Sequence, residues 1–307
     1  MAVITTSGLT MQFGSHRALD AISIEVPSGV TGLVGANGAG KTTLMSIALG
    51  LRNPTDGAIS VLGMDPAKDG ARLRSLVGYG PERNVLPEDM PAFDFVRHFA
   101  EVRGMPRTEA RGRASDALWL VGLGEERFRP LGTMSTGQRQ RVKLCQAIAA
   151  DPSLVLLDEP TDGLDPVQRD EMLALIRQIS AEYSIDVVLS SHLLEEVERI
   201  CDNIVALDAG KLIVQGDLDS LVGDTQTILL ELVEIADQPG AIDGVERRLL
   251  AAGLDVHRDL GRFRITGPDP QATLDIARDA VAAESARLRR LETGRRTLED
   301  LFTEVGA

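Results

Sequence analysis

The segment Gly35-Ala36-Asn37-Gly38-Ala39-Gly40-Lys41-Thr42 decides the fold of this chain. The apolar run Gly32 to Val34 before it is typical of a strand, and helical patterning begins at Lys41. Glycines let the backbone turn so that successive N–H groups point at phosphate oxygens, and the N-terminus of the following helix adds partial positive charge. This setting predicts a phosphate-binding loop rather than an ordinary glycine-rich turn.

The chemistry of the loop follows from its residue types. Lys41 can reach the β- and γ-phosphates of ATP, and Thr42 can ligate Mg²⁺. The residues expected to bind ATP here are Gly35, Ala36, Asn37, Gly38, Ala39, Gly40, Lys41, Thr42 and Thr43.

Two carboxylates follow an apolar strand further along the chain. Leu154-Val155-Leu156-Leu157 is typical of a fully buried strand, and Asp158 and Glu159 emerge at its C-terminal end, where open α/β sheets place their ligands. Asp158 can hold Mg²⁺ through water, and Glu159 can orient the attacking water as a general base. An apolar strand that ends in Asp-Glu is weak evidence alone, but with the phosphate loop it predicts a hydrolytic site.

Strands and helices alternate on both sides of the loop, which predicts an α/β fold with a parallel sheet covered on both faces. The expected strands are Val3–Thr6, Ile22–Val26, Gly32–Val34, Leu154–Leu157, Val187–Leu189 and Ile204–Leu207. The expected helices are Asp170–Tyr183 and Glu195–Cys201. Residues 91–149 have helical apolar spacing and form an expected helical insertion.

The pattern changes after Gly223 and Asp224, which predicts a second, smaller α+β domain with two βαβ-like halves. Its expected elements are strand Ile228–Val233, helix Ala241–Ala252, a hairpin of Asp255–His257 with Phe263–Ile265, helix Gln271–Ala283, strand Ala286–Leu291 and helix Leu298–Val305.

Composition limits the kind of protein. The chain has 307 residues, of which 43% are hydrophobic and 25% charged, as in ordinary soluble globular proteins. Its formal net charge of −14 argues against a nucleic-acid surface, because such surfaces cluster Lys and Arg against phosphates. Cys145 and Cys201 are too few for a disulfide framework and are expected to be small buried hydrophobes.

No secretory signal is evident, and no apolar run approaches the roughly 18 residues that a transmembrane helix needs. We therefore expect a cytosolic protein that another protein must hold in place if it works at a membrane.

The signature segment, Met134-Ser135-Thr136-Gly137-Gln138-Arg139-Gln140-Arg141, resembles that of the nucleotide-binding subunits of ATP-binding cassette (ABC) transporters. Ser135 can cap the following helix and aim its N-terminus at an anion. In the family this anion is the γ-phosphate of ATP held by a second subunit, so the resemblance implies that Ser135, Gly137 and Gln138 bind ATP across a dimer. The chain departs from the usual Leu-Ser-Gly-Gly-Gln at Met134 and Thr136. A simple helix cap is the alternative for Ser135.

Three further residues extend the resemblance. Gly163-Leu164-Asp165 resembles the loop through which the two subunits communicate, which adds Asp165 to the ATP-binding set. His192, after Ser190-Ser191, resembles the switch histidine that contacts the γ-phosphate, and joins Lys41 and Glu159 as a catalytic residue. Phe13 stands where the family stacks an aromatic ring on adenine; core packing is the alternative.

Gly78-Tyr79-Gly80-Pro81-Glu82 matches a loop in which the family usually has Gln at the position of Glu82. There the family residue contacts Mg²⁺ or the lytic water. The carboxylate of Glu82 would add negative charge beside the metal, and we include it with Thr42 and Asp158 as an expected Mg²⁺ ligand. A loop carboxylate without metal contact is the alternative.

The resemblance implies a P-loop ABC-type ATPase core with an N-terminal antiparallel β subdomain. It implies a nucleotide-binding domain at 1–222, with a helical subdomain at about 87–150, and an accessory α+β domain at 225–307. The tail, Arg287 to Leu291 and Thr297 to Phe302, resembles exporter-type ATPases that serve drug, antibiotic or lipid export.

We therefore expect an ATPase that works as a homodimer, powers a multi-span permease from the cytoplasmic face of the membrane, and does not bind nucleic acid. A cytosolic ABC-type ATPase that remodels nucleic acid or ribosomes is the alternative. A P-loop kinase or GTPase would leave the signature segment and His192 unexplained.

Overall fold

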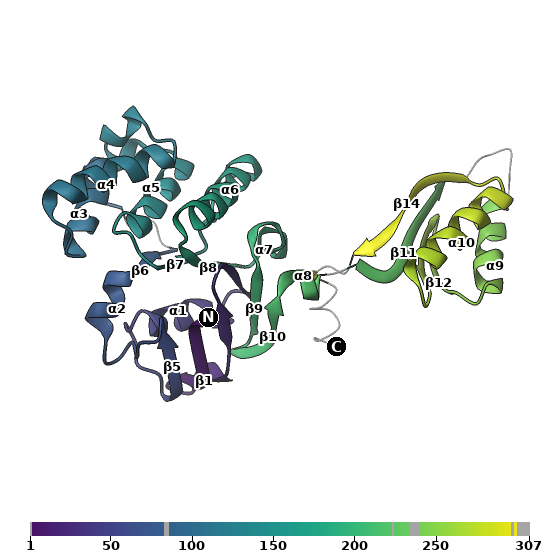
Figure 1. Cartoon of the computed structure of the whole chain (residues 1–307), viewed down its shortest axis with the longest axis horizontal. Helices are drawn as coiled ribbons and strands as arrows, with labels where there is room; N and C mark the ends of the chain where they lie inside the picture. Colours follow the sequence, from purple (N-terminus) through teal and green to yellow (C-terminus); the bar gives the residue numbers. More distant parts are fainter. Residues whose placement is uncertain (1, 83–85, 223, 234–239, 296–297, 300–307) are drawn as a thin grey trace. The chain divides into compact units, whose positions relative to one another are not determined.

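The computed structural model describes residues 2–82, 86–222, 224–233, 240–295 and 298–299. The chain divides into two compact units, Met1–Leu218 and Asp219–Ala307, which are described separately (Figure 1). The α/β fold expected from the sequence is confirmed in the first unit, because a mainly parallel sheet alternates with helices there.

The central sheet of the first unit has the strand order β10-β9-β4-β8-β7-β6. Its strands are β4 (Val30–Val34), β6 (Val77–Gly80), β7 (Leu154–Asp158), β8 (Asp186–Ser191), β9 (Asn203–Asp208) and β10 (Lys211–Asp217). The strands from β9 to β6 are parallel, and β10 is an antiparallel edge. The carboxyl ends of β4, β7 and β8 therefore meet at one edge of the sheet, where such folds bind ligands.

A second, antiparallel sheet forms the N-terminal subdomain. Strand β1 (Ala2–Phe13) pairs with β2 (His16–Ile22), β3 (Glu25–Pro27) and β5 (Asp56–Val61). The single strand expected at Ile22–Val26 is wrong, because β2 ends and β3 begins within it. At this break the buried hydroxyl of Thr6 donates to Ile22 O at 2.9 Å and accepts from Ile24 N at 3.0 Å, in place of a regular ladder.

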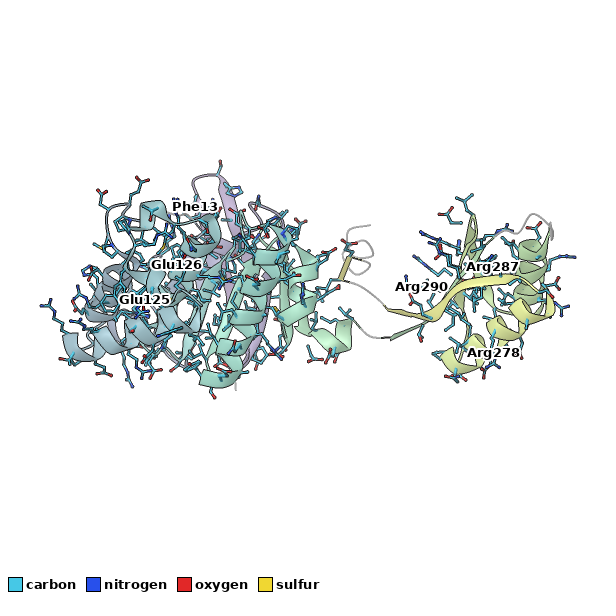
Figure 2. All side chains as sticks on the ribbon, turned by 90° about the horizontal axis from the view of Figure 1, so that it is seen from above. Phe13, Glu125, Glu126, Arg278, Arg287 and Arg290 are labelled. Atoms are coloured by element: carbon cyan, nitrogen blue, oxygen red, sulfur yellow. The ribbon has the colours of Figure 1, made fainter. Side chains whose placement is uncertain are left out.

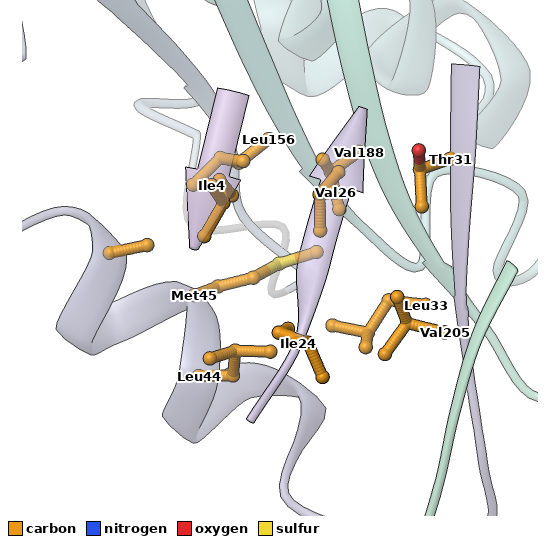
Figure 3. A pocket seen from close by; sticks show the side chains of 11 residues that line it. Ile4, Ile24, Val26, Thr31, Leu33, Leu44, Met45, Leu156, Val188 and Val205 are labelled. Atoms are coloured by element: carbon orange, nitrogen blue, oxygen red, sulfur yellow. The ribbon is translucent and has the colours of Figure 1, made fainter. Parts of the chain in front are cut away.

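Helix α1 (Lys41–Ala48) contributes to a hydrophobic core shared by both sheets. Leu44 and Met45 of this helix line a cavity of about 10 Å³ with Ile4 and Ile24 of the N-terminal subdomain and Leu33 and Val188 of the central sheet (Figure 3). The cavity has room for about one water molecule at most, so the core packs closely beneath the phosphate loop.

The helical subdomain is built from α3 (Ala92–Val102), α4 (Arg107–Leu120) and α5 (Thr136–Ile148), with the 3₁₀ turns η1 (Glu125–Phe128) and η2 (Leu131–Thr133) between α4 and α5. The remaining helices of this unit are α2 (Gly70–Leu76), α6 (Pro166–Tyr183), α7 (Leu194–Ile200) and the start of α8 (Leu218–Leu221). Across the described ranges, no helix is both long and apolar enough to span a membrane.

The second unit is a four-stranded antiparallel sheet with helices on one face (Figure 1). Its elements are β11 (Asp224–Val233), α9 (Ala241–Ala251), β12 (Asp255–Asp259), β13 (Arg262–Thr266), α10 (Pro270–Ala283) and β14 (Arg287–Arg295). The strand order β12-β13-β11-β14 is that of a ferredoxin-like βαββαβ fold, which confirms the two βαβ-like halves. The final helix expected at 298–305 lies outside the described residues beyond Glu299, as do Thr297 and residues 300–302 of the tail.

The surface of this second unit carries arginines, including Arg278, Arg287 and Arg290 (Figure 2). Arg290 pairs with Glu292 at 2.9 Å, and Arg278 pairs with Asp275 at 3.0 Å. These solvent-exposed pairs are worth little stability each.

Candidate functional site

A cavity of about 370 Å³ opens at the carboxyl edge of the central sheet. Its lining comprises Phe13, His16, Ala18, Ala36, Asn37, Gly38, Ala39, Gly40, Lys41, Thr42, Thr43, Glu82, Asp158 and Glu159. This nucleotide cavity therefore brings together residues separated by up to 146 positions in the chain, calculated from Phe13 and Glu159.

The glycines of the phosphate loop fit tight backbone geometry. Gly35 and Gly40 have φ of 155° and 107°, in the region that favours glycine. A Cβ on Gly35 would overlap Leu207 O, and one on Gly40 would lie 2.7 Å from Ala18 O. The loop thus turns sharply between β4 and α1 while it packs against neighbouring backbone.

Lys41 and Glu159, which line the cavity, form a connected set with His192, which does not line it. Nζ of Lys41 donates to Gly35 O at 2.5 Å and lies 3.2 Å from Oε1 of Glu159. Nδ1 of His192 is 2.8 Å from Oε2 of Glu159. The three residues predicted to be catalytic are therefore adjacent, with Glu159 in the middle.

The backbone of Glu159 is unusual, since its φ of 47° is left-handed for a residue with a side chain. Its N–H donates to Oγ of Ser190 at 2.8 Å. The side chain is only 9% exposed, and its Oε1 accepts no hydrogen bond from the described residues although it forms the ion pair with Lys41. A buried carboxylate oxygen with remaining acceptor capacity, held by a strained backbone, is typical of a reactive group.

Asp158 is positioned by two hydroxyl groups. Oγ1 of Thr42 donates to its Oδ2 at 2.9 Å, and Oγ of Ser190 donates to its Oδ1 at 2.7 Å. Ser190 lies directly beside Asp158 in the β7–β8 register and thereby orients both Asp158 and Glu159. Sequence reasoning assigned no role to Ser190; the signal was its place at the end of the neighbouring parallel strand.

The oxygen set of Thr42 and Asp158 suits Mg²⁺, which is usually bound by one or two carboxylates together with substrate phosphates and water. In the described part of the chain, no group of three His, Cys, Asp or Glu side chains could hold a metal by itself. The residues therefore fit a metal that arrives with a phosphate ligand better than one held in an all-protein cage.

Glu82 lines the nucleotide cavity, as expected, but its side chain is exposed. Nζ of Lys143 donates to its main-chain oxygen at 3.0 Å.

Burial, with the nearby charges of Asp158 and Glu82, raises the pKa of Tyr79 to about 12, so this phenol stays protonated near neutral pH.

Phe13, labelled in Figure 2, lines the cavity and is 40% exposed. The guanidinium of Arg52 lies 5.1 Å from its ring centroid. The exposure of the ring argues against core packing, and its stacking on adenine stays a prediction. His16 pairs with Phe13 across the β1–β2 hairpin and lines the same cavity. The sequence reasoning missed His16 because the hairpin itself was not predicted.

The signature segment does not line this cavity. Ser135 is exposed and caps α5 in a capping box, with Oγ accepting from Gln138 N at 3.2 Å and Gln138 Oε1 accepting from Ser135 N at 3.1 Å. Nε2 of Gln138 also donates to Glu126 at 2.8 Å. Within one chain, Ser135, Gly137 and Gln138 are therefore apart from the phosphate loop.

Asp165 caps α6, because its Oδ1 accepts from Gln168 N at 2.9 Å. Its helix packs beside the signature segment: a Cβ on Gly137 would lie 2.9 Å from the side chain of Gln168, and Nε2 of Gln140 donates to Asp162 O at 2.9 Å. The structure thus groups Asp165 with Ser135 and Gly137, separately from the residues of the nucleotide cavity.

The sequence profile of the ABC transporter family matches residues 19–162. Among curated relatives, the bacitracin transport ATP-binding protein BcrA of Bacillus licheniformis is 32% identical over 84% of this chain and 83% of its own length. The methionine import ATP-binding protein MetN of Mesorhizobium japonicum is 31% identical over 91% of this chain and 74% of its own. The daunorubicin/doxorubicin resistance ATP-binding protein DrrA of Streptomyces peucetius is 28% identical over 97% and 91%.

Among solved structures, cbiO1 of Clostridium perfringens, part of the ABC transporter complex cbiONQ, has a TM-score of 0.65 and 26% identity. The match covers 82% of this chain and 97% of cbiO1. The likeness in fold therefore agrees with the sequence matches.

Proposed function

This chain belongs to the ABC transporter family of ATP-binding subunits, and from that premise we propose that it powers a separate permease that exports a drug, antibiotic, lipid or similar amphiphile. As a family member it is an ATPase that uses ATP and Mg²⁺. The direction of transport, the kind of substrate and the roles of individual residues are our proposals.

The observation that carries the catalytic assignment is the adjacent set Lys41, Glu159 and His192. Glu159 acts as the general base, because its buried carboxylate has an acceptor oxygen free of hydrogen bonds to the described residues. Lys41 exchanges Gly35 O and Glu159 for phosphate oxygens and stabilises their charge. His192 holds Glu159 and positions the γ-phosphate.

Thr42 and Asp158 would hold Mg²⁺, with Glu82 beside them in the cavity. When bound, Mg²⁺ supplies positive charge that neutralises phosphate oxygens. Ser190 keeps Asp158 oriented for this task, and the exposed ring of Phe13, which lines the cavity, stacks on the adenine.

A second copy of the chain is proposed to complete the site. Ser135, Gly137, Gln138 and Asp165 are grouped on a region that does not line the nucleotide cavity, which favours contact with a phosphate bound by another chain. Residues 1–222 form the nucleotide-binding domain of this dimer, and 225–307 form an accessory domain.

The proposed permease partner has a candidate contact surface. A groove of about 470 Å³ lies between α2, α3 and β6 and is mainly apolar, with Leu51 and Val102 exposed at 62% and 68%. Arg74 and Arg103 border it, and within the described residues their recorded partners are main-chain carbonyls only. An amphipathic permease segment with an acidic residue suits this groove and would place the chain at the cytoplasmic face of the membrane.

Support for export comes from the bacitracin and daunorubicin/doxorubicin relatives, the second of which aligns with 97% of this chain. The methionine import relative supports the opposite direction. The tail segment 287–291 adds the resemblance to exporter ATPases.

Direction can be measured in inside-out membrane vesicles from cells that express the chain with its permease. We expect ATP added outside to drive uptake of an amphiphile such as daunorubicin, and Glu159→Gln to abolish that uptake. Methionine uptake into right-side-out vesicles loaded with ATP, with no amphiphile accumulation in inside-out vesicles, would contradict export. Co-purification with ribosomes or DNA, without a multi-span protein, would contradict transport itself.

A further inference from the structure

Lys143 is a buried charged residue that the catalytic assignment does not use. It lies on α5, just beyond the signature segment, and is only 4% exposed. Burying an ammonium group is unfavourable unless it is hydrogen-bonded and faces opposite charge. The partners of Lys143 therefore indicate why the fold keeps it there.

Nζ of Lys143 donates a hydrogen bond to the main-chain oxygen of Glu82, at 3.0 Å. This bond joins the helix of the signature segment to the loop that brings Glu82 to the nucleotide cavity. Two glycines of β6 allow the approach of α5: a Cβ on Gly78 would overlap Ala147 O, and one on Gly80 would lie 3.9 Å from Lys143 O. Helix α5 therefore lies directly against β6, and Lys143 reaches the loop that follows it.

The carboxylates whose charge acts on Lys143 lie at or near the nucleotide cavity. Burial lowers the pKa of Lys143 to about 8, while Asp162, Asp158 and Glu82 act in the opposite direction. Asp158 and Glu82 both line the nucleotide cavity, where a triphosphate brings further negative charge. Glu82 adds its carboxylate to a cavity already lined by Asp158 and Glu159, and a buried ammonium interacts with such charges more strongly than it would in water.

We propose that Lys143 is a positioning residue of the nucleotide site, which fixes the main chain at Glu82 and offsets the negative charge that Glu82 adds beside Asp158. The inference rests on the proposed place of Glu82 at the metal–nucleotide site. Without the ammonium, Glu82 and Asp158 repel the triphosphate, and the loop loses its anchor to α5.

A double-mutant cycle tests this pairing. Lys143→Met removes both the charge and the hydrogen bond, Lys143→Gln removes the charge but keeps a donor, and each is combined with Glu82→Gln. The readout is the dissociation constant of a fluorescent ATP analogue measured with and without Mg²⁺, so that binding is followed independently of hydrolysis. Lys68→Met is the matched control, because Lys68 pairs with Asp65 at the surface, with its side chain 81% exposed.

We expect Lys143→Met to weaken binding of the analogue with Mg²⁺ about tenfold when Glu82 is present, and about twofold to threefold in the Glu82→Gln chain. Lys143→Gln should resemble Lys143→Met when Glu82 is present, because charge is the main contribution. Lys68→Met should match the unmodified chain. If Lys143→Met does not fold, as judged by thermal unfolding, the Lys143→Gln pair carries the same test.

Equal weakening by the Lys143 substitutions with Glu82 present and in the Glu82→Gln chain, or unchanged binding in all variants, would overturn the inference. That result leaves the proposed function intact provided that Glu159→Gln still binds ATP and loses hydrolysis. Wild-type hydrolysis by Glu159→Gln would instead contradict the proposed catalytic role, whatever Lys143 does.

Discussion

The nucleotide cavity and the signature segment differ in how their polar side chains are placed: Lys41 and Glu159 of the cavity are buried and paired with each other, whereas Ser135 of the signature segment is exposed at a helix N-terminus. At the cavity, Lys41 and His192 each contact Glu159, whose side chain is only 9% exposed. In the signature segment, Ser135 is exposed and its polar atoms are used in a capping box with Gln138. One region is assembled within a single chain, and the other presents a capped helix N-terminus to its surroundings.

This difference suggests that ATP binding and rapid hydrolysis depend on different regions of the chain. A site that is assembled in one chain can bind ATP alone, whereas an exposed helix N-terminus needs an anion from elsewhere to have a role. If that anion is the phosphate on a second copy, binding is a property of the chain and rapid hydrolysis is a property of the dimer.

The largest expected effect comes from Glu159→Gln in the cavity. Loss of the general base should lower steady-state hydrolysis roughly 10²–10⁴-fold, because proton transfer from the attacking water is no longer assisted. ATP binding should persist, since Lys41 and the loop remain. Phosphate release and equilibrium binding of ATP measure the two quantities, and size-exclusion chromatography should show a dimer that accumulates with ATP.

His192→Ala is the natural companion to that variant, because His192 contacts Glu159 without being the base. It should lower hydrolysis less than Glu159→Gln does. A larger loss in His192→Ala would contradict the assignment of Glu159 as the base.

Ser135→Asp should have the next largest effect, and it separates the two roles of Ser135. Asp is as good a helix cap as Ser, so the unfolding temperature of the chain should change little. Its carboxylate would repel a phosphate from a second chain, so hydrolysis should fall about tenfold to a hundredfold, with ATP binding to a single chain retained. Undiminished hydrolysis would mean that Ser135 is only a cap.

Mixing two inactive variants would test whether the phosphate loop of one chain and the signature segment of a second chain form one ATP site. Lys41→Ala lacks the cavity cation, and Ser135→Asp lacks a working signature segment. A mixed dimer contains one site with an intact Lys41 from one chain and an intact Ser135 from the other, so hydrolysis should recover on mixing. Absence of recovery, with mixed dimers demonstrated by differential tagging, would place both residues in the same chain's site.

A smaller effect is expected from glycine substitutions in the phosphate loop. Gly35→Ala forces a Cβ onto Leu207 O, whereas Gly38→Ala, at φ of 89°, meets open space. Gly35→Ala should therefore lose about 3 kcal/mol of stability, against about 1 kcal/mol for the backbone strain of Gly38→Ala. Thermal unfolding compares the pair, and equal losses would mean that the loop relaxes away from β9.

The sequence predicted the residues that stand in contiguous motifs and missed those that depend on strand register. Lys41, Asp158 and Glu159 could be placed because each follows or precedes a recognisable strand or helix. Ser190 contacts Asp158 only because β7 and β8 pair in one particular register, which no local pattern reveals.

The same limit explains the errors in the N-terminal subdomain. Beyond Thr6, buried apolar residues of β1 alternate with polar residues, so the strand predicted from its apolar run ended at Thr6 although β1 continues to Phe13. The break between β2 and β3 depends on the buried side chain of Thr6, sixteen residues from Ile22 in the sequence. His16 was missed for this reason, because its approach to the cavity follows from the β1–β2 hairpin.

The smallest expected effect is a change in the reactivity of the two cysteines, of which Cys201 lies near the phosphate loop and Cys145 near the signature segment. Cys145 is in α5 behind the signature segment, and Cys201 lies under β4, where a Cβ on Gly32 would be 3.2 Å from its Sγ. Burial raises the pKa of both thiols, so near neutral pH neither is ionised in the folded chain and reaction with a thiol reagent requires local opening. The raised pKa values also mean that the unfolded chain loses these protons first, so stability from the two thiols falls as the pH rises above their unfolded value.

Single-cysteine chains, Cys145→Ala and Cys201→Ala, let the two openings be timed separately at neutral pH. At protein concentrations low enough to keep the chain monomeric, ATP with Mg²⁺ should slow labelling of Cys201 about tenfold or more, because binding stabilises the phosphate-loop region. Labelling of Cys145 should slow much less, because in a monomer the signature segment gains no contact and α5 is linked to the nucleotide cavity through the Lys143 bond to Glu82 O. Equal protection of both thiols in the monomer would break the distinction between the two regions, since it would mean that they open as one unit.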